Sequence, residues 1–95
     1  MKSVKALYSV SLYTERPEEE AAHIFAMLQR IAMLTYVDSP VRLESVEPGK
    51  AVYSFRLYSD DPETEAERIR IAVDGVLSLA YIAPLHLERI VEEVK

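Results

Sequence analysis

Apolar and polar residues alternate from Lys2 to Tyr13, the first patterned stretch of the chain. A period of two predicts a strand that buries one of its faces. Two more strands are predicted at 41–46 and 51–59, joined as a hairpin by the turn Glu47 to Lys50, which contains Pro-Gly. The residues expected to point inward are Val4, Ala6, Tyr8, Val10 and Leu12 on the first strand and Ala51, Tyr53, Phe55 and Leu57 on the third.

Two helices are predicted where apolar residues recur at helical spacing after a proline and several acids. The first begins at Pro17 and is expected to run to about Leu34. The same start signal recurs at 60–63, with Asp61 as N-cap, and the second helix should continue until Pro84 kinks or breaks it. The expected core stripes are Ala21, Ile24, Phe25, Leu28, Ile31 and Ala32, then Ala66, Ile69, Val73, Val76, Leu77 and Ala80.

The tail, residues 86–95, places Leu87, Ile90, Val91 and Val94 at helical spacing. We therefore expect a helical tail, with a fourth strand as the alternative. The whole chain, 1–95, is expected to form one α+β domain of order β-α-β-β-α. This is a ferredoxin-like half sandwich, with a three-stranded antiparallel-type sheet and both helices on one face.

Two features of this arrangement predict association with other chains. Without a fourth strand, the first strand lies at a sheet edge, and Leu7, Ser9 and Ser11 would pair with a second copy. The stretch 69–85 is also apolar nearly all round, more than one sheet can cover. The residues we expect at the partner interface are Met27, Arg70, Ile71, Asp74, Ser78, Leu79, Tyr81 and Ile82.

Arg70 stands one helical turn before Asp74, within reach of an ion pair. We expect this pair to fix the register of a helix–helix interface. The simpler interpretation is that Arg68 and Arg70 are surface residues that balance nearby glutamates.

Composition narrows the classes of function. The chain is 49% hydrophobic and 28% charged, as globular proteins are. It has no cysteine, which excludes disulfides, thiolate metal sites and a cysteine nucleophile. A net charge of -5 argues against electrostatic capture of nucleic acid or of an anionic membrane. Since no apolar run is long enough to span a bilayer, we expect a cytoplasmic protein.

Candidate chemistry is sparse. Two glycines cannot build a phosphate-binding loop, and His23 and His86 show no metal-ligand spacing. The acidic clusters are explained by helix starts, and no serine lies in a nucleophile motif. We therefore expect no enzyme, no cofactor and no metal.

The alternative function is a stand-alone ferredoxin-like module that binds RNA or a small ligand. Tyr8, Tyr53 and Tyr58 lie in strands, where aromatic rings can stack on bases. The basic glycine-aromatic motif that accompanies such stacking is absent, which favours core or interface tyrosines.

The run from Arg68 to Ile82 resembles the signature helix of the small dimerisation subunit of the KEOPS complex, the CTAG/Pcc family. That helix reads approximately L-R-x-A-x-N-S-x-L-x-x-L. Ile69 and Arg70 correspond to the Leu-Arg pair, and Ala72 and Val73 to the small and apolar positions after it. Asp74-Gly75 stands where the family usually has Asn-Ser.

The resemblance implies a non-catalytic scaffold in a complex that makes threonylcarbamoyladenosine in transfer RNA. Such a subunit forms a homodimer, or a heterodimer with a paralogue. It binds the catalytic threonylcarbamoyltransferase subunit through its helices and meets tRNA only through the complex.

Overall fold

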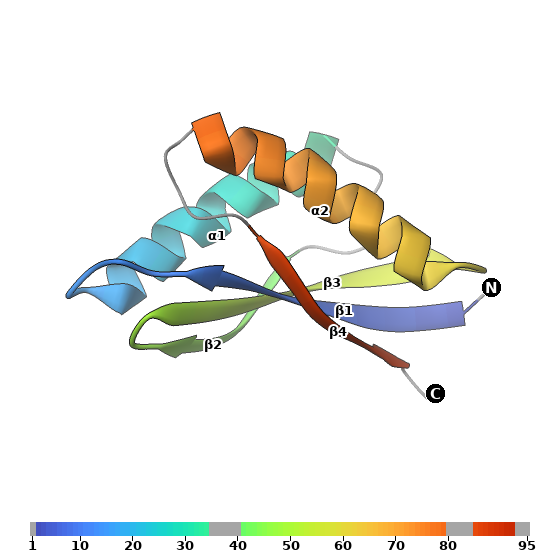
Figure 1. Cartoon of the computed structure of the whole chain (residues 1–95), viewed down its shortest axis with the longest axis horizontal. Helices are drawn as coiled ribbons and strands as arrows, with labels where there is room; N and C mark the ends of the chain where they lie inside the picture. Colours follow the sequence, from blue (N-terminus) through green and yellow to red (C-terminus); the bar gives the residue numbers. More distant parts are fainter. Residues whose placement is uncertain (1, 35–40, 80–84, 93–95) are drawn as a thin grey trace.

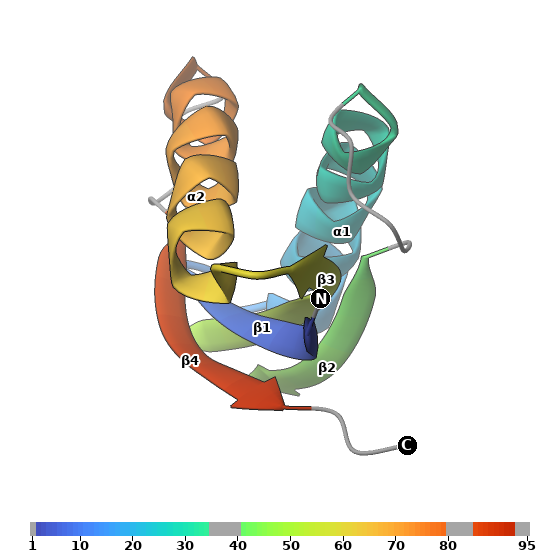
Figure 2. The same ribbon diagram turned by 90° about the vertical axis from the view of Figure 1, so that its right-hand side faces the viewer.

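The structure is a computed structural model that describes residues 2–34, 41–79 and 85–92. The elements are β1 (Lys2–Ser11), α1 (Pro17–Leu34), β2 (Arg42–Glu47), β3 (Lys50–Ser59), α2 (Pro62–Leu79) and β4 (His86–Glu92). The strands form one antiparallel sheet in the order β2-β3-β1-β4. Both helices cover the same face of the sheet (Figures 1 and 2). This is the complete ferredoxin-like arrangement rather than the expected half sandwich.

The predicted helical tail is wrong, because residues 86–92 form β4 and pair with β1 from Ser9↔His86 to Val4↔Glu92. The reason is a bulge at Glu88, where the register shifts. The extra residue lets Leu87 and Ile90 face the helices together and pack against the core. Their spacing of three residues therefore imitates a helix. Val94 lies outside the described residues.

The predicted sheet edge is wrong for the same reason. β1 is a central strand with β3 on one side and β4 on the other, and Leu7 and Ser9 lie within the stretch that β4 pairs. Ser11 lies beyond the last residue that β4 pairs, and its own partner is Lys50 of β3. Charged residues lie along the two outer strands, which blunts both edges against further pairing.

One hydrophobic core lies between the sheet and the helices. The inward residues predicted on β1 and β3 are all buried. Ala21, Ile24, Leu28 and Ile31 of α1 and Ala66, Ile69, Val73 and Leu77 of α2 are buried as predicted, and Phe25 is partly buried against the core. The prediction that Val76 belongs to the core is wrong, because 41% of its surface is exposed. Ala80 and Pro84 lie outside the described residues, as does the side chain of Ala32.

Two buried tyrosines attach the helices to the sheet. Tyr8 of β1 donates a hydrogen bond of 2.9 Å to the carbonyl of Ala66 in α2. Tyr53 of β3 donates one of 3.0 Å to the carbonyl of Ala21 in α1. The two tyrosines stand directly opposite each other on neighbouring strands. Burial raises the pKa of both phenol groups above its ordinary value.

These contacts belong to an internal repeat. Residues 6–24 and 51–69 carry the same residue type at many positions, always at one offset, as between Tyr8 and Tyr53. The identical pairs are Ala6/Ala51, Tyr8/Tyr53, Ser9/Ser54, Leu12/Leu57, Tyr13/Tyr58, Pro17/Pro62, Glu18/Glu63, Glu20/Glu65, Ala21/Ala66 and Ile24/Ile69. The chain is thus two βαβ halves, β1-α1-β2 and β3-α2-β4, related by an approximate two-fold axis between the two tyrosines.

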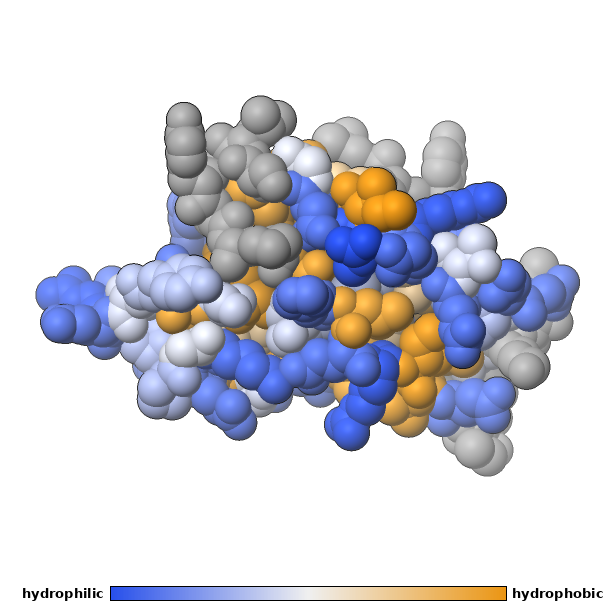
Figure 3. Space-filling model, viewed as in Figure 1, coloured by the Kyte–Doolittle hydropathy of each residue, from blue (hydrophilic) through white to orange (hydrophobic). Residues whose placement is uncertain are grey.

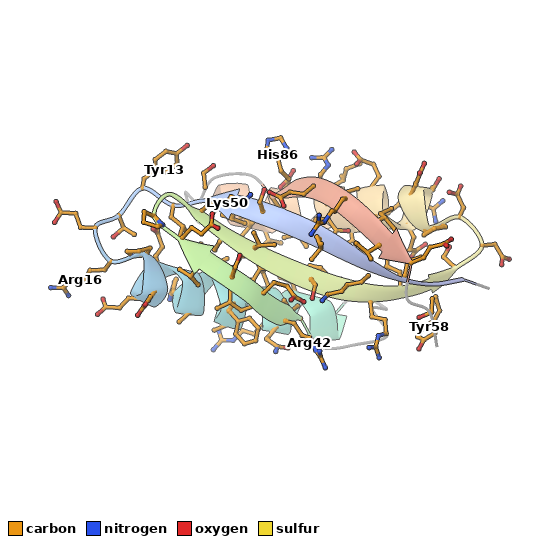
Figure 4. All side chains as sticks on the ribbon, turned by 90° about the horizontal axis from the view of Figure 1, so that it is seen from below. Tyr13, Arg16, Arg42, Lys50, Tyr58 and His86 are labelled. Carbon is orange, nitrogen blue, oxygen red and sulfur yellow. The ribbon has the colours of Figure 1, made fainter. Side chains whose placement is uncertain are left out.

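The face of the sheet without helices repeats the symmetry in its polar contacts. Lys5 of β1 forms a 2.6 Å ion pair with Glu44 of β2, which also accepts a 2.6 Å hydrogen bond from Ser54. In the other half, Lys50 pairs with Glu88 at 2.5 Å, and Glu88 is hydrogen-bonded to Ser9. The lysines hold the pKa of both glutamates below its usual range. Figure 4 shows this face, with the equivalent residues Tyr13 and Tyr58 at opposite ends.

Candidate protein-interaction surface

The outer side of α2 carries an apolar strip that no part of the described chain covers. Ile71 is 59% exposed and Val76 41% exposed, and Ala72 and Gly75 beside them are exposed as well. We call these four residues the α2 stripe: Ile71 and Gly75, and Ala72 and Val76, are neighbours on the helix surface because each pair is spaced by four positions, and Ala72 and Gly75 are spaced by three. Figure 3 shows hydrophobic atoms over the middle of α2, bordered by hydrophilic ones.

Gly75 gives this strip a flat centre. A Cβ atom added there would meet nothing within 4 Å, so open space lies over the backbone. A neighbouring backbone can therefore approach α2 closely at Gly75, as small residues permit at helix–helix contacts.

A charged row borders the α2 stripe on one side. The Arg70 guanidinium contacts Glu67 at 2.5 Å and Asp74 at 2.6 Å, so the ion pair predicted from spacing is confirmed. Arg70 also lowers the pKa of the Glu67 carboxyl. Asp74 uses its other oxygen to accept a 2.5 Å hydrogen bond from the Leu85 backbone N–H. This carboxylate therefore ties the last turns of α2 to the start of β4.

The outer face of α1 carries alanines rather than large apolar residues. Ala22, Ala26 and Arg30 are exposed there, and we call them the α1 stripe. Under the internal repeat, Ala26 occupies the position of Ile71. Gln29, equivalent to Asp74, also holds the end of its helix, donating a 3.3 Å hydrogen bond to the carbonyl of Val41 before β2.

The interface residues predicted from sequence divide into three groups. Ile71 is exposed on the α2 stripe, while Arg70 and Asp74 are half-buried beside it. Met27 is partly buried against the core. The side chains of Ser78 and Leu79, and the whole of Tyr81 and Ile82, lie outside the described residues.

Sequence reasoning missed Val76 and Gly75 as surface residues. Val76 fits the core stripe of α2 by its helical spacing, although the structure leaves it exposed. The internal repeat gives no sign of this exposure, because Val76 corresponds to Ile31 of α1, which is only 8% exposed. The two helices therefore differ in how they are covered at equivalent positions.

The sheet face offers less to a stand-alone RNA-binding module. Tyr8 and Tyr53 are buried beneath the helices, and of the three strand tyrosines only Tyr58 is exposed, at 43%. Lys5 and Lys50 are each paired with a glutamate. His23 and His86 are both exposed, the first as expected of a surface histidine.

Within 2–34, 41–79 and 85–92, no group of three histidine, aspartate or glutamate side chains is placed to hold a metal ion. None of the helices described is both long and apolar enough to cross a membrane. In comparisons with known proteins, no family model, no curated protein and no solved structure matches the chain.

Proposed function

We propose that this chain is a non-catalytic scaffold subunit that binds another protein through the outer faces of its helices. The observation that carries the proposal is the α2 stripe, an apolar strip on a helix whose opposite face already fills the core. An exposed apolar strip bordered by polar residues is typical of a protein–protein contact. The large residues Ile71 and Val76 beside a glycine suit a partner helix, because large and small residues in alternation let two helices interlock.

The energy available supports a partner that covers the whole stripe. Fully burying an isoleucine or valine stabilises by about 1.5–3 kcal/mol, and roughly half of each side chain remains to be buried here. Two such residues give about 2 kcal/mol, less than the cost of association. The partner must therefore reach beyond them, to Ala72, Gly75 and the charged row at Arg70.

The resemblance of residues 68–82 to the CTAG/Pcc signature helix suggests which protein the partner is. In this proposal the chain binds the catalytic threonylcarbamoyltransferase subunit of a cytoplasmic KEOPS-like complex and meets tRNA only through that complex. The stripe residues Ala72 and Gly75 and the neighbouring pair Arg70–Asp74 all lie within the segment that carries the resemblance.

Reconstitution with the threonylcarbamoyltransferase subunit encoded in the same genome tests the proposal. Two matched variants decide it, since Val76 on α2 and Val91 on β4 are 41% and 40% exposed. We expect Val76→Glu to weaken binding by about tenfold or more and Val91→Glu to leave it unchanged, as measured by calorimetric titration.

Circular dichroism and thermal melts of both variants serve as the control for folding. Absence of binding by the wild-type chain, or equal loss with both variants, would contradict the proposal. Salt-dependent binding of RNA by the isolated chain, weakened by Val91→Glu and not by Val76→Glu, would favour the alternative module on the sheet face.

A further inference from the structure

One carboxylate oxygen of Glu20, in the first turn of α1, is buried without a hydrogen-bond partner in the described part of the chain. The side chain as a whole is half-buried, so it reaches the surface while its Oε2 atom is turned inward. Burying a charged oxygen that accepts no hydrogen bond is unfavourable, and such atoms are rare in folded proteins. Oε2 of Glu20 therefore lacks a donor that the fold itself does not supply.

The donors nearest to Glu20 are already engaged elsewhere. Its carboxylate adds to the burial that raises the pKa of the Tyr53 phenol, so the two groups lie close together. The Tyr53 hydroxyl, however, donates its proton to the carbonyl of Ala21 at 3.0 Å. Arg16 stands one helical turn before Glu20, but its guanidinium contacts Glu19 at 3.6 Å.

Glu20 lies on the side of α1 that is turned toward α2. Gln29 follows it by nine positions, about two and a half helical turns, so the two side chains leave the helix on opposite sides. Gln29 reaches the carbonyl of Val41, just before the outer strand β2. The two helices pack mainly on the strands and stand apart in Figure 2. A protein that lies across both helices would therefore pass over Glu20.

The other half of the chain shows that the repeat does not require this buried oxygen. Glu65 of α2 is the residue equivalent to Glu20, and it precedes Asp74 by the same nine positions. Its carboxylate has no buried oxygen without a partner among the described residues. Instead Glu65 lines an open hollow at the start of α2, together with Tyr58 and Arg68. The same residue at the same place is thus open to solvent in one half and buried without a partner in the other.

We infer that Glu20 binds a basic side chain, an arginine or a lysine, of the protein that docks on the helices. This inference rests on the proposed function, because it names the chemistry of that partner at one point. A cationic donor forms a short, charge-assisted hydrogen bond with a carboxylate and neutralises it. The two helices together carry seven acidic residues and three arginines, so they attract a basic surface. Of these arginines, Arg70 is already held by Glu67 and Asp74.

Small cations test the site without any protein partner. Methylguanidinium and methylammonium represent the ends of arginine and lysine, and NMR follows the carboxyl signals of Glu20 and Glu65 during a titration. We expect the Glu20 signal to shift at lower cation concentrations than the Glu65 signal, and Glu65→Gln to leave that shift unchanged. Equal shifts of the two signals, or no shift at Glu20, would overturn the inference and would mean that water alone satisfies the oxygen.

Titration with the threonylcarbamoyltransferase subunit tests the same residue in the complex. We expect Glu20→Gln to raise the dissociation constant by about tenfold, and the matched variant Glu65→Gln to leave it unchanged. Added salt should weaken binding of the wild type more than binding of Glu20→Gln. Equal affinities of Glu20→Gln and the wild type would overturn this inference alone. A wild-type chain that shows the cation shift but binds no such subunit would overturn the proposed function alone.

Thermal unfolding separates a binding role from a structural one. Both substitutions remove a negative charge from the first turn of a helix, but only Glu20→Gln also removes the charge from a buried oxygen without a partner. The midpoint of Glu20→Gln should therefore lie above that of Glu65→Gln. A lower midpoint for Glu20→Gln would show that its carboxylate stabilises the free chain, which would overturn the inference.

Discussion

The two βαβ halves of this protein make matching contacts in the core and across the open face of the sheet, and they differ on the outer faces of their helices. Tyr8 and Tyr53, Ala21 and Ala66, and the lysine–glutamate–serine clusters at Lys5 and Lys50 make matching contacts. On the outer helix faces, alanine stands at 26 and isoleucine at 71. The matching contacts stabilise the fold in both halves. The exposed isoleucine at 71 makes no such contact within the described chain, which is why we assign it to binding.

The largest test of the interior match replaces an identical core residue in each half. Ile24→Ala and Ile69→Ala should each lower the free energy of unfolding by about 2–5 kcal/mol, because each leaves a cavity under a helix. Ile24 is fully buried and Ile69 is 7% exposed, so the first should cost more. Chemical denaturation measures both values. A loss confined to one half would break the comparison.

A smaller effect is expected at Asp74 and Gln29, the different residues with which the two halves hold the end of a helix to the backbone just before the next strand. Asp74→Ala removes a charged acceptor from Leu85 and from Arg70, and should cost about 1.5–3 kcal/mol. Gln29→Ala removes one neutral hydrogen bond to Val41 and should cost about 0.5–1.5 kcal/mol. Equal losses would show that the two helix ends are held in some other way. Hydrogen exchange at the Leu85 amide provides the local readout.

The tyrosine pair predicts both a stability change and a pH dependence. Tyr8→Phe and Tyr53→Phe should each cost about 0.5–1.5 kcal/mol, since each removes one buried hydrogen bond. Burial raises the pKa of both phenols in the folded state above the ordinary value of 10.0. Their contribution to stability is therefore complete below about pH 10 and is lost as the pH rises toward the folded pKa.

The double variant Tyr8→Phe, Tyr53→Phe should lose stability less steeply above that pH than the wild type. Unfolding by denaturant from pH 8 to pH 11.5, with the wild type as the reference, checks this prediction. Parallel curves for the two proteins would exclude the tyrosines as the cause.

The smallest effect concerns the helix starts. In both halves a hydroxyl two residues before the helix cap accepts the cap N–H, from Arg16 to Thr14 and from Asp61 to Ser59. The Asp61 side chain then accepts hydrogen bonds from Thr64, whereas the Arg16 side chain has no acceptor atom. Asp61→Ala should lower the midpoint of thermal unfolding slightly, and Arg16→Asp should raise it slightly, because one loses and the other gains a side-chain acceptor at the helix start. A destabilising Arg16→Asp would show that the two starts are not equivalent.

Sequence patterns were sufficient for the first five elements, because their alternation and helix-start signals are local. They failed at β4, where a bulge at Glu88 gives a strand the spacing of a helix. They failed again at Val76, because helical periodicity places a residue on a face and cannot say how wide the covered part of that face is. Of the candidate site, the exposure of Ile71 and the Arg70–Asp74 ion pair could be predicted from the sequence. The internal repeat was visible in the sequence and would have predicted a fourth strand from the second.

The position of β4 also has a consequence for folding. Its partner β1 comes from the opposite end of the chain, so this last pairing closes a loop of nearly the whole sequence. Contacts between distant residues form late and slow the folding of small domains. A chain whose β4 has not yet paired exposes the backbone edge of β1, and β4 of a second chain can pair with that edge instead. We therefore expect strand exchange between chains during refolding at high concentration, seen as a slow refolding phase whose amplitude falls when the chain is diluted.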